Sequence, residues 1–147
     1  MIGLWIHRRI ARTSLAKFGH HELDAFMKAW DEDGIFVYPG TTSMAGRFEG
    51  KEAVRAWFQR FMDRFPRIEF TVKHVGVEKA FGLTSNVTSV EWRVSVTNKR
   101  KEDYAWDGMT VIRVDKGKAV LVLDYIFDTS VLKRALGEDP ERLERSA

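Results

Sequence analysis

The second half of the sequence consists of long extended segments, and this feature limits the folds open to the chain. From Ile68 onward, β-branched and aromatic residues fill four consecutive stretches separated by short polar or glycine-containing breaks. The stretches are Ile68–Lys79, Leu83–Thr97, Asp103–Val114 and Ala119–Phe127, and the breaks are Ala80–Gly82, Asn98–Glu102 and Asp115–Gly117. Because short breaks join neighbouring strands, the pattern predicts an antiparallel meander. Strands this long exceed the usual length of about five or six residues, so the sheet must twist and curl strongly.

Residues before Ile68 show helical periodicity instead. Apolar side chains recur at helical spacing over Leu4–Phe18 and again over Leu23–Trp30. A third helix is expected between Gly50 and Pro66, where one face carries Val54, Trp57, Phe58, Phe61, Met62 and Phe65. Between the second and third helices, the β-prone run Asp33–Gly40 predicts a short strand that opens into a loop up to Gly46.

Helices followed by a meander predict an α+β fold, in which three N-terminal helices pack against the apolar face of a strongly curved sheet. The 147 residues suit one domain, which we place at residues 1–137, and we expect the charged residues 138–147 to form a frayed tail or a short helix. A sheet that curls around helices encloses a cone-shaped hollow. If side chains do not fill this hollow, it is a ligand pocket.

Composition excludes several classes of protein. The sequence has no cysteine, which excludes disulfides, a thiolate nucleophile and cysteine metal sites. Its apolar runs are far shorter than the about 20 residues of a membrane span, and His7–Arg9 interrupts the apolar N-terminus. The sequence therefore predicts neither a membrane span nor a signal peptide, and we expect a cytoplasmic protein.

The charge pattern is typical of a solvated surface and not of a nucleic-acid partner. The 24 basic and 21 acidic residues are interspersed and leave a net charge of +3. The basic clusters, one at Arg8, Arg9 and Arg12 and one at Lys99–Lys101, lack the pattern of a single-strand binding platform. The histidines lack metal-site spacing and the glycines lack a phosphate-loop context, so we expect no metal and no cofactor.

Three stretches of the sequence resemble a known family. They are Trp30–Asp33 followed by Tyr38–Gly40, Gly46–Val54 at the start of the third helix, and Gly117–Asp128 in the last strand. With the order of the predicted elements, they make residues 13–137 similar to the SnoaL-like family of the nuclear transport factor 2-like superfamily. The resemblance implies a cone-shaped fold. The superfamily includes polyketide cyclases, ketosteroid isomerases, limonene-epoxide hydrolases, dehydratases, oxygenase subunits and binding or dimerisation modules, so the activity depends on the pocket.

Asp124 is the first candidate for catalysis. Along the last strand it shares a face with Val120, Val122 and Ile126, so a lone carboxyl group stands among β-branched residues. If this face lines the hollow, desolvation raises the carboxyl pKa and favours a role as general acid or base. The position also resembles that of the proton-transferring acid of the limonene-epoxide hydrolases. The alternative is a structural carboxylate near the strand end or at a dimer interface.

Glu91, Arg93 and Ser95 form a polar face on the second long strand. The run Glu91-Trp-Arg-Val-Ser95 resembles the Arg-x-Asp element of the epoxide hydrolases. In one alignment Arg93 matches the arginine and Ser95 the second carboxylate; in the other, shifted by two residues, Glu91 and Arg93 match these positions. In this hypothesis Arg93 binds the Asp124 carboxylate or adjusts its pKa. Ser95 lacks the carboxyl group of that pattern, which disfavours epoxide hydrolysis. The alternative places Glu91 and Arg93 on the outer face as a cross-strand or solvated pair.

Tyr38 and Asp107 are candidates for stabilising an oxyanion. Tyr38 precedes Pro39 where the ketosteroid isomerases carry their proton-shuttling aspartate; a phenol with a pKa of about 10 is a poor base at neutral pH but can donate a hydrogen bond. Asp107 is similar in position to the carboxylic acid that stabilises the oxyanion in those isomerases. The alternative for Asp107 and Gly108 is an ordinary bulge or turn pair.

These candidates predict a cofactor-independent enzyme that does acid–base chemistry on a small, largely apolar molecule, as an isomerase, cyclase, dehydratase or hydrolase. The alternative is a non-catalytic binding or dimerisation module of the same fold. Expected pocket residues besides Glu91 and Ser95 are Phe36, Trp57, Phe61, Trp106 and Val122, although such residues are more often simply core. A homodimer is also expected, because Leu121, Leu123, Tyr125 and Phe127 form an apolar face opposite Asp124.

Overall fold

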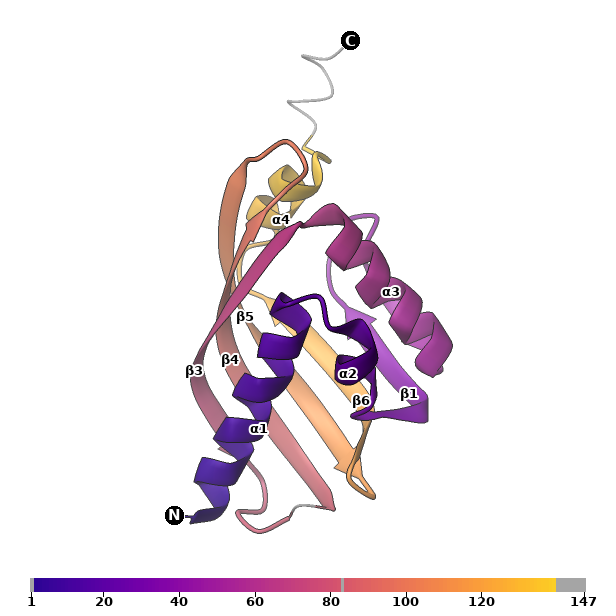
Figure 1. Cartoon of the computed structure of the whole chain (residues 1–147), viewed down its shortest axis with the longest axis vertical. Helices are drawn as coiled ribbons and strands as arrows, with labels where there is room; N and C mark the ends of the chain where they lie inside the picture. The colour runs from indigo at the N-terminus through magenta and orange to yellow at the C-terminus, as the bar shows by residue number, and fades with distance from the viewer. Residues whose placement is uncertain (1, 83, 140–147) are drawn as a thin grey trace.

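The computed structural model describes residues 2–82 and 84–139 (Figure 1). Its elements are α1 (Ile2–Gly19), α2 (Leu23–Met27), β1 (Trp30–Tyr38), β2 (Gly46–Glu49), α3 (Lys51–Arg64), β3 (Arg67–Val77), β4 (Ser85–Thr97), β5 (Asp103–Asp115), β6 (Lys118–Ile126) and α4 (Thr129–Leu136). The predicted helices and long strands are therefore present, with ends that differ by a few residues. None of the helices in this part of the chain combines the length and the hydropathy needed to cross a lipid bilayer.

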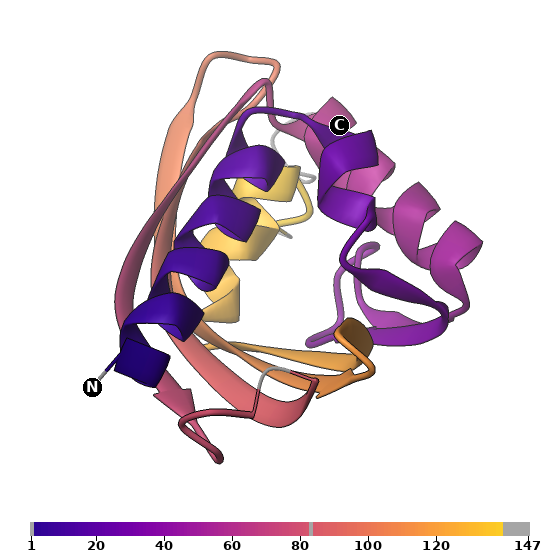
Figure 2. The same ribbon diagram turned by 60° about the horizontal axis from the view of Figure 1, so that its bottom comes forward.

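The strands form one sheet in the order β2-β1-β6-β5-β4-β3. Strands β3 to β6 pair with their sequence neighbours in antiparallel fashion, which confirms the predicted meander. Strand β1 is parallel to β6 and antiparallel to β2, so the sheet is mixed. The sheet curls around the N-terminal helices, which lie on its concave side (Figures 1 and 2). The α+β cone expected from the sequence is thus confirmed.

Three local expectations were wrong or incomplete. The second helix ends at Met27, because Trp30 already pairs with Ala119 of β6 as the first residue of β1. The segment from Gly46 forms a short strand, β2, whose Phe48 lies opposite Phe36. Helix α4 was not expected.

Helix α4 carries clear local signals at both ends. Asp128 caps its N-terminus by accepting a hydrogen bond from the Ser130 N–H, and Gly137 ends it with a φ of +73°. Glu138 follows and accepts hydrogen bonds from the Ser43 N–H. Most of the expected terminal segment, residues 140–147, lies outside the described residues.

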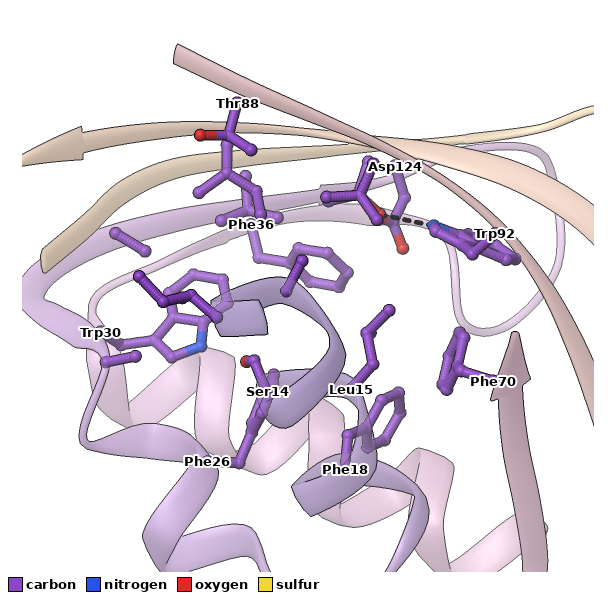
Figure 3. Close-up of a pocket in the computed structure, with 18 of the residues that line it drawn as sticks. Ser14, Leu15, Phe18, Phe26, Trp30, Phe36, Phe70, Thr88, Trp92 and Asp124 are labelled. Carbon is purple, nitrogen blue, oxygen red and sulfur yellow. Dashed lines mark hydrogen bonds between the residues drawn. The ribbon is translucent and has the colours of Figure 1, made fainter. Parts of the chain in front are cut away.

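The inner face of the sheet packs against aromatic side chains of the helices. On β4 the buried residues alternate, so that Trp92, Val94 and Val96 point inward. Phe70 of β3 contacts both Trp92 and Phe18 of α1, with ring centroids 5.5 and 5.4 Å apart (Figure 3). A bulge in β6 leaves Val120 out of the pairing with β5, so Ala119 and not Val120 shares the inward face with Val122.

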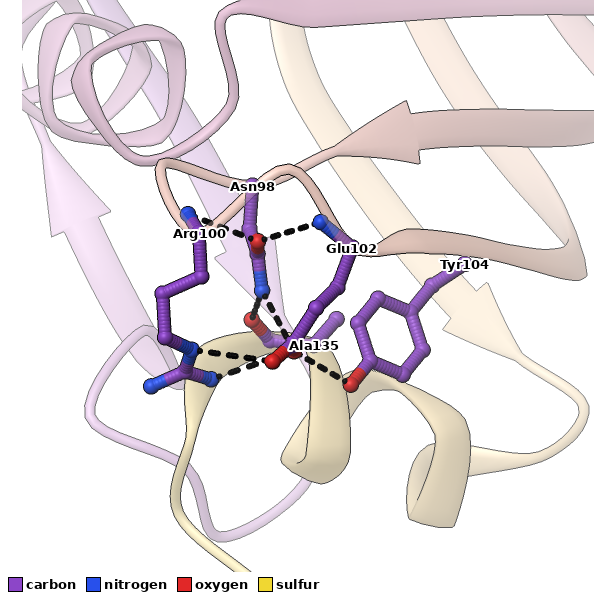
Figure 4. A network of polar contacts seen from close by, with 5 residues as sticks. All are labelled: Asn98, Arg100, Glu102, Tyr104 and Ala135. Carbon is purple, nitrogen blue, oxygen red and sulfur yellow. Dashed lines mark hydrogen bonds and ion pairs between the residues drawn. The ribbon is translucent and has the colours of Figure 1, made fainter.

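Buried asparagines hold the turns at both ends of β4. Asn98 accepts hydrogen bonds from the backbone N–H groups of Arg100 and Glu102, and donates to the Glu102 carboxylate and to the Ala135 carbonyl of α4 (Figure 4). At the other end, Asn86 bonds both backbone groups of Lys79 and the carbonyl of Gly82. Asn98 thereby fastens α4 to the β4–β5 hairpin.

We expect Asn98→Ala to lower the free energy of unfolding by about 1–3 kcal/mol, because it leaves two backbone N–H groups of the turn without their acceptor. Urea denaturation followed by circular dichroism measures this change. Lys99→Ala, at an exposed position of the same turn, is the matched control and should stay close to the parent protein. Equal stability of Asn98→Ala and Lys99→Ala would contradict the role given to Asn98.

Candidate active site

A cavity of about 240 Å³ lies between the concave face of the sheet and helices α1, α2 and α3. Eleven of its lining residues are aromatic. This volume is many times the roughly 10–15 Å³ that a cavity needs to hold one water molecule. The hollow predicted from the curled sheet is therefore open to a small ligand and is not filled by side chains.

Asp124 is the acidic side chain of this cavity. It projects from β6 beside Val122, and no other Asp or Glu among the described residues lines the cavity. The described lining residues also include no lysine or arginine, and their only histidine is His7 on α1. The structure thus shows that the strand face shared by Asp124 and Val122 lines the hollow, and the catalytic role of Asp124 stays a prediction.

Two successive hydrogen bonds from neighbouring strands position the Asp124 carboxyl group, and Figure 3 labels the residues at their two ends, Trp92 and Asp124. The Thr110 hydroxyl on β5 donates a hydrogen bond of 2.6 Å to Asp124 Oδ1, and the Trp92 indole Nε1 on β4 donates one of 2.8 Å to the same hydroxyl. Because an indole N–H can only donate, the Thr110 oxygen accepts from Trp92 and its proton points to Asp124. Asp124 Oδ2 has no hydrogen-bond partner among the described residues and stays free for a ligand.

Gly108 makes this arrangement possible. It lies opposite Trp92 in the β4–β5 register, and a Cβ at Gly108 would lie 2.4 Å from the Trp92 ring and 2.6 Å from the carbonyl oxygen of Tyr125. The absent side chain lets the indole lie across β5 and reach Thr110. Gly108 sits within regular pairing on both sides, so the alternative of a bulge or turn at Asp107 and Gly108 was wrong.

Burial sets the protonation of the two polar groups in this part of the cavity. Desolvation raises the pKa of Asp124 to about 7, although the hydrogen bond from Thr110 lowers it in part. The pKa of Tyr38 is raised well above its usual value, first by burial and then by the negative charge of Asp124. At neutral pH Tyr38 is therefore a neutral phenol that can donate a hydrogen bond, and Asp124 lies near its titration midpoint.

Tyr38 lies next to Asp124 across β1 and β6. Each follows by one residue the parallel pair Val37 and Leu123, and both line the cavity. The Tyr38 ring packs on Trp57 of α3 at a centroid distance of 4.6 Å. These contacts fix the phenol beside the carboxyl group.

The structure contradicts the expectation that Arg93 and Asp107 join this site. Arg93 Nη1 pairs with Asp107 Oδ2 at 3.0 Å, and Lys73 Nζ pairs with Asp107 Oδ1 at 2.9 Å, all on the outer face of the sheet. The hydrogen bond from Lys73 is the main cause that lowers the pKa of Asp107, with a further contribution from Arg93. Arg93 therefore neither holds Asp124 nor tunes it.

Glu91 and Ser95 lie on the same outer face. Glu91 accepts a hydrogen bond of 2.6 Å from His74 Nδ1, and Ser95 pairs with Glu69 in the β3–β4 register. The physical reason is the alternation of β4, because burying Trp92 and Val94 turns Glu91, Arg93 and Ser95 outward. The structure confirms the alternative that Glu91 and Arg93 lie on the outer face. They do not pair with each other, because Glu91 binds His74 and Arg93 binds Asp107.

The other expected pocket residues do line the cavity. These are Phe36, Trp57, Phe61, Trp106 and Val122. Contact with a substrate stays a prediction for each of them. Sequence reasoning missed Thr110 and Trp92; the signal that could have found Thr110 is its alternation with Trp106 and Ile112 on one face of the third long strand.

The walls also contain two buried polar atoms without a hydrogen-bond partner in the described part of the chain, His7 Nε2 and Trp106 Nε1. Across residues 2–82 and 84–139, no three His, Asp or Glu side chains converge to hold a metal ion. At Asp124 the cavity thus brings together a carboxyl group, the Tyr38 phenol and the Thr110 hydroxyl, and elsewhere its polar lining residues are His7, Ser14, Asn86 and Thr88.

Comparison with known proteins identifies the family. The SnoaL-like domain family matches residues 11–122, and the chain therefore belongs to this family. This match includes Thr110, which donates a hydrogen bond to Asp124, and Trp92, which donates one to Thr110. It ends at Val122 in β6, two residues before Asp124. No protein with a curated description matches the sequence at a significant level.

Solved structures confirm the NTF2-like fold. Bal32a, from a soil-derived mobile gene cassette, gives a TM-score of 0.77 at 16% identity, covering 91% of this chain and 98% of that one. An NTF2-like protein of unknown function from Burkholderia pseudomallei gives 0.74 at 20% identity, covering 88% and 96%. An LEH-like epoxide hydrolase from M. tuberculosis gives 0.66 at 17% identity, covering 95% of each chain. At these identities the likeness concerns the fold alone.

The raised pKa predicts how Asp124 affects stability. Since the folded-state pKa of about 7 exceeds the unfolded value of about 3.9, the folded protein binds more protons between these values, and its stability falls as pH rises through this range. Asp124→Asn removes this effect. The free energy of unfolding of the variant minus that of the parent protein should therefore increase by roughly 2–4 kcal/mol from about pH 4 to pH 8. Urea denaturation across this pH range measures the gain.

Asp107→Asn is the control of opposite sign. Because the pKa of Asp107 is lowered by its cations, its ionised form stabilises the folded state above the unfolded pKa, and this contribution is lost as pH falls. The variant should thus lose stability at neutral pH and approach the parent protein in acid. A constant stability difference between Asp124→Asn and the parent protein at all pH values would contradict the buried titration.

Proposed function

We propose that this protein is a cofactor-independent enzyme that transfers protons on a small, largely apolar molecule bound in the sheet hollow. The observation that carries the proposal is the Asp124 carboxyl group, which lines an aromatic cavity and whose Oδ2 has no partner among the described residues. Its pKa of about 7 is close to the neutral pH at which a general acid or base works best. Families with this fold differ in activity, so the proposal rests on the site and not on the fold.

The mechanism follows from the positions of the two polar groups. Asp124 Oδ2 removes a proton from a carbon beside a carbonyl group and returns it at a second position or to an oxygen. The Tyr38 phenol donates a hydrogen bond to the oxygen on which negative charge develops. The apolar walls exclude water, which strengthens both interactions.

Thr110 and Trp92 prepare the carboxyl group for this role. The Thr110 hydrogen bond occupies Oδ1 and leaves Oδ2 to face the substrate. It also stabilises the ionised form, so that a carboxyl group desolvated by the cavity walls can still act as a base at neutral pH. Trp92 fixes the direction in which the hydroxyl donates.

The outward position of Arg93 narrows the reaction class. Among the described residues, neither an arginine nor a second carboxylate joins Asp124 at the cavity, so the carboxylate–arginine–carboxylate group that activates water is not assembled from this part of the chain. Isomerisation, aldol-type cyclisation and dehydration need only a base and a donor to the oxyanion. We therefore favour these proton-transfer reactions over hydrolysis.

Proton removal can be tested without knowing the natural substrate. The probe is 2-tetralone, a bicyclic aromatic ketone with acidic protons, and the readout is deuterium uptake from D₂O by NMR. We expect saturable exchange above the buffer rate, reduced by about 10²–10⁴-fold in Asp124→Asn and by roughly 10–100-fold in Tyr38→Phe. Asp107→Asn on the outer face is the control and should exchange like the parent protein.

Thr110 variants separate catalysis from folding. Thr110→Val should shift the pH profile of exchange upward, because the carboxylate loses its hydrogen bond, whereas Thr110→Ser should keep the parent profile. Exchange by the parent protein no faster than by Asp124→Asn would remove the acid–base role. Saturable binding of the ketone without exchange would support the second candidate function, a binding module, because the described lining residues include a single carboxyl group.

We also infer a homodimer formed through the outer face of β5 and β6. This face carries Met109, Val111, Leu121, Leu123 and Tyr125 by the strand register, and the side chains of Tyr125 and the following Phe127 are 51% and 62% exposed. Apolar surface of this kind favours contact with a second protein surface.

Analytical ultracentrifugation at micromolar concentration should show a dimer, and Tyr125→Lys should shift the protein toward monomer by burying a charge at the contact. Lys99→Ala, far from this face, should leave the association unchanged. A parent protein that sediments as a monomer would contradict the inference.

A further inference from the structure

We propose that the cavity takes a ligand with a protonated amine, whose ammonium group pairs with Asp124 while its apolar body contacts the aromatic walls. The proposal rests on the proposed function in placing the ligand at Asp124, and it adds the chemical class of that ligand. It concerns selectivity by charge, which neither the size of the cavity nor the fold determines.

The first argument is the charge balance of the cavity. Asp124 makes no ion pair in the described part of the chain, whereas the cations Lys73 and Arg93 are committed to Asp107 on the outer face. Thr110 supplies one hydrogen bond from a neutral group. A buried carboxylate without a cation is costly, and a carboxylate can accept several more hydrogen bonds than the one it receives. A ligand ammonium group supplies both the missing charge and the missing donors.

The second argument is the nature of the walls near Asp124. Trp92 and Phe70 lie on one side of the cavity with ring centroids 5.5 Å apart, and Phe18 faces them from α1 (Figure 3). The faces of aromatic rings carry negative potential and attract cations within about 6 Å. Asp124 and these rings line the same cavity, so a cation paired with Asp124 Oδ2 is bound in an aromatic chamber.

The same surroundings disfavour an anionic ligand. A carboxylate or phosphate would meet a like charge on Asp124 and the negative faces of the rings, and no lysine or arginine among the described lining residues would compensate. The titratable wall groups besides Asp124 are Tyr38 on β1 and His7 on α1. Tyr38 is a neutral phenol, since burial and the charge of Asp124 raise its pKa.

An ammonium ligand is also compatible with proton transfer. The proton between the ligand nitrogen and Asp124 Oδ2 can reside on either atom. The complex is then either an ammonium–carboxylate ion pair or a neutral pair of amine and carboxylic acid. Pairing with a cation favours the ionised carboxylate, which opposes the effect of burial on the Asp124 pKa. The bound amine thus holds the carboxyl group in the form that acts as a base.

Three probes of equal shape test this inference. They are 2-naphthylmethylamine, 2-naphthylmethanol and 2-naphthoate, which are cationic, neutral and anionic at pH 7.5, and isothermal titration calorimetry measures their binding. In the parent protein we expect the amine to bind at least about tenfold more tightly than the alcohol, and the naphthoate to bind more weakly than both. Asp124→Asn should weaken the amine by about tenfold or more and change the alcohol little. Asp107→Asn should leave all three affinities unchanged.

An alcohol that binds as tightly as the amine, or an amine affinity that survives Asp124→Asn, would overturn the inference. Neither result would affect the proposed acid–base role of Asp124, which the deuterium-exchange experiment tests separately. Conversely, selective binding of the amine without deuterium exchange would support the inference and contradict the enzymatic role. Failure of all three probes to bind would count against both. The ranking of the probes in the parent protein decides the question even if Asp124→Asn does not fold.

Discussion

The candidate site depends on one close contact, the passage of the Trp92 indole over Gly108. With no Cβ at Gly108, the indole crosses β5 and its N–H reaches the Thr110 hydroxyl at 2.8 Å. That hydrogen bond directs the Thr110 proton to Asp124, and Asp124 in turn presents its other oxygen to the cavity. A glycine in the middle of a long strand usually weakens it, and here it makes room for the donor that orients the site.

The sheet separates charge between its two faces. On the outer face, Asp107 is ionised and paired with Lys73 and Arg93, where water reduces the cost of charge. On the inner face, Asp124 has one neutral donor and no cation among the described residues, so burial moves its pKa toward neutrality. The two aspartates thus differ in chemistry because they point to opposite sides of neighbouring strands.

The sequence was informative where a pattern repeated. The meander, the third helix and the sharing of one strand face by Asp124 and Val122 all follow from alternation or helical spacing of apolar residues, and the structure confirms them. Helix α4 and strand β2 are short, so periodicity carried little signal for either. The misplacement of Arg93 has a different origin, because the family resemblance favoured a charged strand face over the apolar face that the core required.

The sequence alone determined the order of the elements and the sharing of one strand face by Val122 and Asp124, because these depend on local spacing. Only the tertiary structure decided which face of each strand lies inside, because the curled sheet buries the set of side chains that packs best against the helices. It also supplied the Thr110 and Trp92 donors, which lie 14 residues before Asp124 and 18 residues before Thr110 respectively. Such partners meet only through strand pairing and register, which no local pattern in the chain specifies.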